Sequence, residues 1–339
     1  MAVSAGITDF TFMEEKSAQL FVNAPNALEG NYKAKCDTAA AAFQSKESGV
    51  VDFTGDEASI LSQIRTLVSI LPANNEEDLS EEDCQDDLNR MCSGIEGLAG
   101  DPIQVLSMIS DNHFVMEVKK DYEPSMVTAF IRLNGVTVGC VANRTERYED
   151  GKKADEFEAA LSGKGCDKAV ELISFCDAFS IPLLTLTNVN GYKAKMCSER
   201  RIARAAARLT YAYADATVPK VTVVTGKALG SAGLTMGSKS LGTDLVYAWP
   251  NAVIGTMEPE AAVKIMYAKE IEASDDAVAL ISEKTAEYTK TQSGAVAAAR
   301  RGYADDIIKA EETRQRLAAA FDMLYTKSED RPSKKHGTV

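Results

Sequence analysis

The spacing of apolar residues changes along the chain, and each change predicts a different kind of element. Residues 56–72 carry apolar side chains at helical spacing, with acidic residues at the start and a proline at the end. This spacing predicts an amphipathic helix. Residues 126–143 instead form two runs rich in β-branched residues around Asn134 and Gly135. That dipeptide favours a tight hairpin turn, so two antiparallel strands are expected.

From residue 165 onward, helical patterns alternate with short runs that are almost wholly apolar. The sequence predicts helices at 165–180, 198–216 and near 231–240, strands at 181–188, 220–226, 244–249 and 252–256, and helical structure throughout 257–327. The first part of the chain, residues 6–25, suits two buried strands around a turn. Because strands that are apolar on both faces need a cover on each, these elements indicate an α/β sheet packed between helices.

Composition and charge disfavour several classes of protein. The chain has 339 residues, of which 45% are hydrophobic and 26% are charged, as expected for one large or two ordinary globular domains. Its formal net charge of −13 disfavours binding to nucleic acid, which requires a basic face. Part of the acid is concentrated in residues 76–87, which we interpret as a solvated connector; a run that binds a partner is the alternative.

The sequence shows no sign of insertion into a membrane or of export. No apolar run approaches the ~20 residues that a membrane-spanning helix needs, and no leader peptide opens the chain. The seven cysteines include no CxxC pair, and reduced thiols are expected rather than a disulfide framework. Together these features predict a cytoplasmic protein.

Side chains suited to catalysis are sparse. Neither of the two histidines, His113 and His336, lies near a serine or cysteine in a nucleophile setting. We interpret His113 as structural and His336 as part of a basic tail. No group of residues has the spacing of metal ligands, so no metal site is expected. The glycines of 226–233 are in the wrong order for a phosphate-binding loop or a dinucleotide-binding turn.

Two junctions between a predicted strand and a predicted helix remain as candidates. They are residues 187–195 and 225–236, and both place glycine or small residues where a buried strand gives way to a helix. A helix N-terminus offers N–H groups without acceptors and a favourable potential for an anion. If the two junctions face one another, they can form an oxyanion hole. The alternative is that both are simply tight turns that need glycine.

Several blocks of the sequence closely resemble one protein family, the carboxyltransferase subunits of biotin-dependent acyl-CoA carboxylases and decarboxylases. In order along the chain, these blocks are residues 125–146, 174–192, 217–257, 301–314 and 328–339. Residues 8–13, 21–28 and 59–77 also resemble this family, in the second half of its N-terminal domain.

The resemblance implies a crotonase-type α/β fold built from ββα spiral repeats. It places a partial N-terminal domain at 1–75, an acidic connector at 76–101 and a complete C-terminal, biotin-side domain at 102–339. The family transfers a carboxyl group between carboxybiotin and an acyl-CoA. In the family, one oxyanion hole of backbone N–H groups holds the thioester carbonyl, and a second holds the ureido oxygen of biotin.

The biotin-side hole of the family maps onto both junctions. It corresponds to Gly191 and Tyr192 in the first junction and to Gly230, Ser231 and Ala232 in the second. The expected donors are the backbone N–H groups of Ser231 and Ala232. Such donors stabilise the negative charge that develops on oxygen during carboxyl transfer. The resemblance also implies that the biotin nitrogen, once CO2 has left it, takes the substrate proton, so no dedicated histidine or carboxylate base is expected.

Neighbouring positions bear on specificity and packing. Gly233 and Leu234 stand where many family members have an aromatic residue and an aspartate, side chains associated with the choice of acyl group. Their replacement leaves the acyl group of this chain open. Trp249, Pro250 and Asn251 also match the family, and for these we expect core packing and a turn.

The resemblance also implies partners. Biotin is expected on a separate biotin carboxyl carrier protein, because the chain has no Met-Lys biotinyl signature. Acyl-CoA is the expected substrate, and a homo-oligomer based on dimers, up to a hexamer, is the expected assembly. A complete family member has a further segment before the position of Met1, with the glycine-rich loop of the acyl-CoA hole. We therefore expect the chain to lack the first half of the N-terminal domain.

Two other functions remain open at the level of sequence. The first is a non-catalytic or regulatory subunit that keeps the fold and the interface of such a complex. The second is a crotonase-type hydratase or isomerase that acts on acyl-CoA without biotin. That activity needs an acid/base carboxylate beside the oxyanion hole, and none is evident in the sequence.

Overall fold

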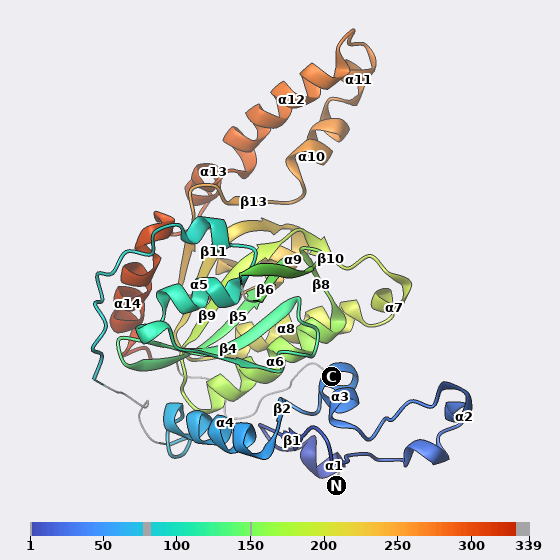
Figure 1. Cartoon of the computed structure of the whole chain (residues 1–339). Helices are drawn as coiled ribbons and strands as arrows, with labels where there is room; N and C mark the ends of the chain where they lie inside the picture. The colour runs from blue at the N-terminus through green and yellow to red at the C-terminus, as the bar shows by residue number, and fades with distance from the viewer. Residues whose placement is uncertain (1, 77–82, 150, 330–339) are drawn as a thin grey trace.

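An eight-stranded mixed sheet forms the centre of the protein (Figure 1). The computed structural model describes residues 2–76, 83–149 and 151–329. The strands run in the order β14-β12-β11-β9-β5-β4-β3, and β13 pairs with the end of β11. Their bounds are β3 Val115–Val118, β4 Met126–Leu133, β5 Val136–Asn143, β9 Leu183–Val189, β11 Lys220–Leu229, β12 Leu245–Ala248, β13 Val253–Gly255 and β14 Asp306–Ile307. From β5 to β14 the neighbours are parallel, whereas β3, β4 and β5 pair antiparallel.

Helices cover both faces of this sheet, which confirms the predicted α/β architecture. Helices α6 (Gly163–Ala178) and α8 (Ile202–Asp215) pack on one face, and α5 (Pro102–Ile109) and α14 (Thr313–Leu324) pack on the other. Neighbouring residues of β4 supply different cores: Phe130 packs with the first pair of helices, and Ile131 with the second. The predicted hairpin is also confirmed, because Asn134 and Gly135 both have positive φ, as a type I′ turn requires.

Trp249 lies in the core, as the sequence predicted. Its side chain is fully buried, and its Nε1–H donates a hydrogen bond to Thr313 Oγ1 at 3.0 Å. Pro250 and Asn251 then form the expected turn before β13. The indole therefore fixes the start of α14 against the edge of the sheet.

The front segment, residues 2–76, contains little regular structure besides one helix. The prediction of two strands within 6–25 is wrong: only β1 (Phe12–Glu14) forms, and it pairs in parallel with β2 (Phe53–Gly55). The chain turns after β1 because the Glu14 carboxylate accepts the N–H groups of Lys16 and Ser17. The predicted amphipathic helix is confirmed as α4 (Glu57–Ile70), which is capped by the side chain of Asp56.

The connector is only partly solvated, which corrects the interpretation of residues 76–87. Residues 77–82 lie outside the described residues. Beyond them, the Asp86 carboxylate accepts hydrogen bonds from Arg90 and lies 3.4 Å from the buried guanidinium of Arg314. Cys92 is buried, and its N–H donates to Glu311 O. Asp86 therefore pairs with cations of the domain, whereas Glu76, Asp83 and Asp87 are exposed.

The last part of the chain contains an arm that projects from the body (Figure 1). The arm consists of α10 (Pro259–Met266), α11 (Ala268–Glu272) and α12 (Ala277–Tyr288), and α13 (Ala295–Arg300) follows. The prediction of helix throughout 257–327 is wrong at β14, which adds a strand beside β12. The backbone of Asp305 and its carboxylate both hydrogen bond to Val246, and these bonds hold the chain in an extended path there.

Shorter elements complete the fold. They are α1 Ala2–Ala5, α2 Asn31–Ala34, α3 Ala41–Phe43, β6 Glu146–Glu149, β7 Lys152–Glu156, β8 Ala160–Leu161, β10 Gly191–Tyr192, α7 Met196–Glu199 and α9 Gly230–Thr235. None of the helices in the described ranges combines the length and the apolar character that crossing a bilayer requires.

Candidate functional site

The two junctions predicted from the sequence lie side by side. Strands β9 and β11 are parallel neighbours, so both junctions follow the same edge of the sheet. After β9 the chain forms β10, which pairs in parallel with β8. After β11 it enters α9. The hydroxyl groups of Tyr192 in β10 and Thr235 in α9 lie 3.2 Å apart, which ties the two junctions together.

Helix α9 begins at a sharp change of backbone direction. Leu229 is extended, and Gly230 has a φ of +59°, which side chains rarely tolerate. Ser231 and Ala232 are therefore the second and third residues of the helix, and their N–H groups have no acceptor within it. In the described part of the chain, neither N–H finds a backbone acceptor in a neighbouring loop or turn.

Gly233 holds this helix close to the strand that precedes it. A Cβ atom at Gly233 would lie 2.6 Å from the carbonyl carbon of Ala228, a distance that real Cβ contacts do not show. Only glycine fits without a shift of the backbone. The next residue, Leu234, is 48% exposed and faces the hollow beside the helix. Gly233 therefore packs α9 closely against the preceding strand, and the adjacent Leu234 presents an apolar side chain to the cavity.

A cavity of about 550 Å³ lies beside α9. Gly230, Ser231, Gly233 and Leu234 form part of its wall, whereas Gly191, Tyr192 and Ala232 are not among the lining residues. Much of the remaining wall is apolar and comes from the sheet and the turn after α9: Val224, Ala228, Met236, Val246 and Ile254. Among the described residues that line it there is no aspartate, glutamate, histidine or cysteine. A hydratase-type carboxylate is therefore absent from this wall.

Residues that the sequence did not single out close the cavity. Tyr288 and Gln292 come from the base of the arm, and Arg301 and Tyr303 follow α13. The Arg301 guanidinium donates hydrogen bonds to the backbone and side-chain oxygens of Gln292. Arg301 and Tyr303 belong to a block that resembles the family, but nothing in their residue types indicates that the arm returns to α9. An isolated bridge between Val253 and Gly294 brings it there.

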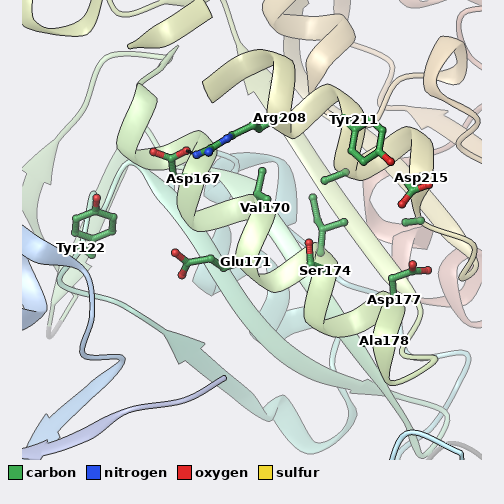
Figure 2. A pocket seen from close by; sticks show the side chains of 13 residues that line it. Tyr122, Asp167, Val170, Glu171, Ser174, Asp177, Ala178, Arg208, Tyr211 and Asp215 are labelled. Carbon is green, nitrogen blue, oxygen red and sulfur yellow. Dashed lines mark ion pairs between the residues drawn. The ribbon is translucent and has the colours of Figure 1, made fainter. Parts of the chain in front are cut away.

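A second hollow of about 550 Å³ lies between α6 and α8 (Figure 2). Its polar groups are largely engaged within the fold. Asp167 pairs with Arg201 at 2.9 Å and with Arg208 at 3.6 Å. The Asp177 carboxylate accepts the N–H and the hydroxyl of Thr217. These contacts hold the two helices together, so the cavity beside α9 is the stronger candidate for a functional site.

A cluster of ionisable groups lies where the front segment meets the body, away from this cavity. Burial raises the pKa of Asp52 to about 6, and burial lowers the pKa of Lys168 to about 7. The Lys119 ammonium lies 2.6 Å from Glu171, donates to Gly49 O and lies 3.5 Å from Asp52 Oδ1. Lys168 donates to the carbonyl oxygens of Tyr122 and Met126. Through Lys119, the cluster therefore links the front segment to the body.

His113 is structural, as interpreted from the sequence. Its Nδ1 lies 2.9 Å from the carbonyl oxygen of Ser107, at the end of α5. His336 lies outside the described residues. All seven cysteines are free thiols in the structure.

Comparison with known proteins identifies relatives over the whole chain. The carboxyl transferase domain family matches residues 2–339. A methylmalonyl-CoA decarboxylase subunit alpha from Propionigenium modestum is 37% identical over 99% of this chain and 66% of its own length. A putative propionyl-CoA carboxylase beta chain from Bacillus subtilis (strain 168) is 39% identical, with the same coverage of both chains. The chain thus spans just under two thirds of the length of these relatives.

A solved structure supports the same assignment. The transcarboxylase 12S structure, described as a hexamer assembly with methylmalonyl-coenzyme A and methylmalonic acid bound, superposes with a TM-score of 0.87 at 36% identity. The match covers 99% of this chain and 65% of that one. It confirms the crotonase-type fold expected from the sequence. The chain belongs to the carboxyl transferase domain family.

Proposed function

We propose that the chain acts in biotin-dependent carboxyl transfer between carboxybiotin and an acyl-CoA, as part of a carboxylase or decarboxylase. The observation that carries this proposal is the start of α9. There, the N–H groups of Ser231 and Ala232 lack acceptors within the helix, and Ser231 borders a cavity with largely apolar walls. The names of the relatives support the same activity.

The residues present fit a biotin ring. The ureido oxygen of biotin needs hydrogen-bond donors, and the N–H groups at the start of α9 are such donors. The rest of the bicycle is apolar and matches walls formed by Val224 and Ile254. Biotin, when bound, supplies the nitrogen that carries the carboxyl group. The chain's own contribution is to orient the ring, to keep water from it and to hold negative charge on the ureido oxygen.

Gly191 and Tyr192 belong to this proposal as the facing junction. The contact between Tyr192 and Thr235 supports a role in positioning α9. Fixed donors cost no reorganisation when charge develops, and removal of one such donor typically costs ~2.7–4 kcal/mol of barrier. A shift of α9 would therefore lower the rate even if every N–H group remained.

Gly233 and Leu234 are proposed to influence the choice of acyl group. Leu234 presents an apolar side chain to the cavity, and Gly233 leaves room only for backbone at its own position. This pair favours an apolar contact over a charged one at the reacting end of the substrate. Which acyl group is used would follow from kinetics with a series of acyl-CoA substrates.

The remaining parts of the proposal concern partners and location. Biotin would arrive on a separate biotin carboxyl carrier protein, and acyl-CoA would be the substrate. A homo-oligomer based on dimers, up to a hexamer, is supported by the hexamer assembly described for the similar transcarboxylase 12S protein. Seven free thiols support a reducing, cytoplasmic location.

The test removes one donor and keeps the side chain small. The assay follows loss of the carboxyl group from malonyl-CoA or methylmalonyl-CoA in the presence of free biotin. Ser231→Pro deletes an N–H group in the first helical turn, where proline is tolerated, and Ser231→Ala keeps that group. We expect turnover to fall by roughly 10²–10³-fold in the proline variant and to change little in the alanine variant.

Two results would contradict the proposal. One is equal turnover by Ser231→Pro and Ser231→Ala. The other is full turnover without biotin, which would favour a crotonase-type reaction on acyl-CoA alone. Circular dichroism and thermal unfolding of both variants provide the control for folding.

A further inference from the structure

A strongly basic segment follows the candidate site directly in the sequence. Residues 193–208 contain one acidic residue, Glu199, in a chain whose net charge is −13. The six cationic residues of this segment are Lys193, Lys195, Arg200, Arg201, Arg204 and Arg208. A concentration of one sign of charge against the sign of the whole molecule creates a local field that attracts an oppositely charged partner.

The segment is anchored at the candidate site and extends away from it. Lys193 follows Tyr192, and its N–H donates to Leu161 O at 2.8 Å, which holds it beside β8. The chain then continues through α7, which lies on a loop that projects from the body beyond β10 and α9 (Figure 1). It returns to the body at α8. A partner bound to this loop would therefore sit next to both junctions.

Part of this charge is free to act on a partner. Arg201 and Arg208 pair with Asp167, and Lys193 lies 3.6 Å from Glu123. Lys195 and Arg200 are exposed and form no ion pair with any residue in the described ranges. Between them lies Met196, whose side chain is 77% exposed. The surface thus combines uncompensated cations with an apolar side chain.

We infer that this basic segment, centred on Lys195, Met196 and Arg200, is the surface on which an acidic face of the biotin carrier protein docks. The inference rests on the proposed function, which requires biotin to be delivered by another polypeptide. On α8, the cationic positions extend from Arg204 to Arg208, about one helical turn. The cations on and beside α7 lengthen this surface further, so it is larger than a single phosphate group. The exposed methionine suits a protein face better than a phosphate.

The test compares carrier-borne biotin with free biotin. The probe is a recombinant acidic biotinyl domain of a carboxylase, biotinylated on its lysine, and its binding to the chain is measured by calorimetry at several salt concentrations. The variant is Lys195→Glu with Arg200→Glu. The matched control is Lys309→Glu with Arg316→Glu, which makes the same change of net charge beside α14, on the other side of the body (Figure 1).

Docking predicts a large and selective effect. Affinity for the biotinyl domain should fall by roughly 10–100-fold in the Lys195/Arg200 variant at low salt, and the difference should shrink as salt rises. The control variant should bind within about twofold of the parent protein. Turnover with free biotin should be unchanged in both variants. A further variant, Met196→Ala, should weaken binding without altering its dependence on salt.

The outcomes separate docking from the proposed function. Selective loss of carrier binding supports docking even if no carboxyl transfer is seen, in which case the proposed function fails alone. Unchanged carrier binding in the Lys195/Arg200 variant overturns docking, whether or not turnover with free biotin is present. A rise in the KM of acyl-CoA without a change in carrier binding also overturns it and assigns the surface to the phosphate groups of coenzyme A.

Discussion

The central sheet and the front segment bury their apolar residues in different ways. Every residue of β4 is buried, and its neighbouring side chains enter two separate cores. In the front segment the sheet consists of two three-residue strands, and apolar residues such as Val22 and Val68 stay exposed. The body therefore buries whole strands, whereas the front segment buries selected residues, of which Phe53, Leu67 and Ile70 join a core cluster of the body.

The contacts between the front segment and the body are mixed in kind. Phe10 packs edge-on against Phe175 of α6, with ring centroids 4.8 Å apart. Lys119 of the body reaches Gly49 O and Asp52 in the front segment. Because both a shared apolar cluster and an ionisable cluster join the two regions, the front segment should respond to mutations in this core and also to pH.

The largest effect is expected from a cavity in the body. Phe130→Ala removes a fully buried ring between the sheet and α6 and should lower the free energy of unfolding by about 3–5 kcal/mol. The matched change in the front segment, Phe21→Ala, removes a ring that is already partly exposed and should cost less than about 1 kcal/mol. Denaturant unfolding measures both. Equal losses would contradict the difference in burial between these two rings.

The next effect concerns pH and the front segment. The folded-state pKa of Asp52, about 6, lies above its ordinary value of 3.8, so the folded state holds this proton more tightly than the unfolded chain. Stability from this group is therefore fully present below about pH 4 and is lost as the pH rises to about 6. The difference is on the order of 3 kcal/mol at most, since each unit of pKa corresponds to ~1.4 kcal/mol.

Asp52→Asn should remove this dependence. Hydrogen exchange of β1 and β2 between pH 4 and 7 reports it, after correction for the intrinsic exchange rate. The prediction fails if the variant keeps the slope of the parent protein. The control is Asp9→Asn, which changes a carboxylate of the front segment whose side chain is exposed.

A smaller loss is expected at the helix that borders the cavity. Gly233→Ala places a methyl group within 3 Å of the backbone of Ala228, so α9 must shift and about 1–3 kcal/mol of stability should be lost. Gly191→Ala is the control, because a Cβ atom there would meet nothing within 4 Å. Thermal unfolding distinguishes the two. Equal unfolding midpoints for the two variants would show that the end of β11 shifts to make room for the methyl group at little cost in stability.

The smallest effect is expected on the exposed side of α4. Leu61→Lys and Val68→Lys change residues that are 59% and 70% exposed, so each should alter the stability of the isolated chain by less than about 0.5 kcal/mol. Sedimentation of the same variants reports whether this face takes part in assembly. A loss of several kcal/mol in a monomer would show that the helix is covered by the chain itself.

The sequence predicted the body better than the front segment because the signals in the body come from residues that are neighbours in the sequence. The hairpin follows from Asn134 and Gly135 together with the flanking β-branched runs, and α8 follows from a strong helical period. Only one of the two strands predicted within 6–25 forms, and it ends early because the Glu14 carboxylate accepts the N–H groups of Lys16 and Ser17. Strand β14 is two residues long, too short to leave a periodic signal.

Long-range pairing explains what the sequence could not predict. Asp86 is not fully solvated because it lies beside Arg314, which is distant in the sequence and reaches Asp86 only after folding. The same holds for the candidate site. The sequence identified the glycines of the two junctions. The part of the cavity wall that Tyr288 and Arg301 supply could not be predicted, because it depends on how the arm folds back to α9.

The first turn of α9 has a consequence for how this segment tolerates genetic change. The groups that we propose to hold the ureido oxygen belong to the main chain, so most single amino-acid replacements at Ser231 leave them in place. Proline alone among the standard residues deletes such a group. Saturation mutagenesis of the exposed Ser231 should therefore give a flat profile with a minimum at proline, whereas the buried Ala232 and the closely packed Gly233 should accept few side chains.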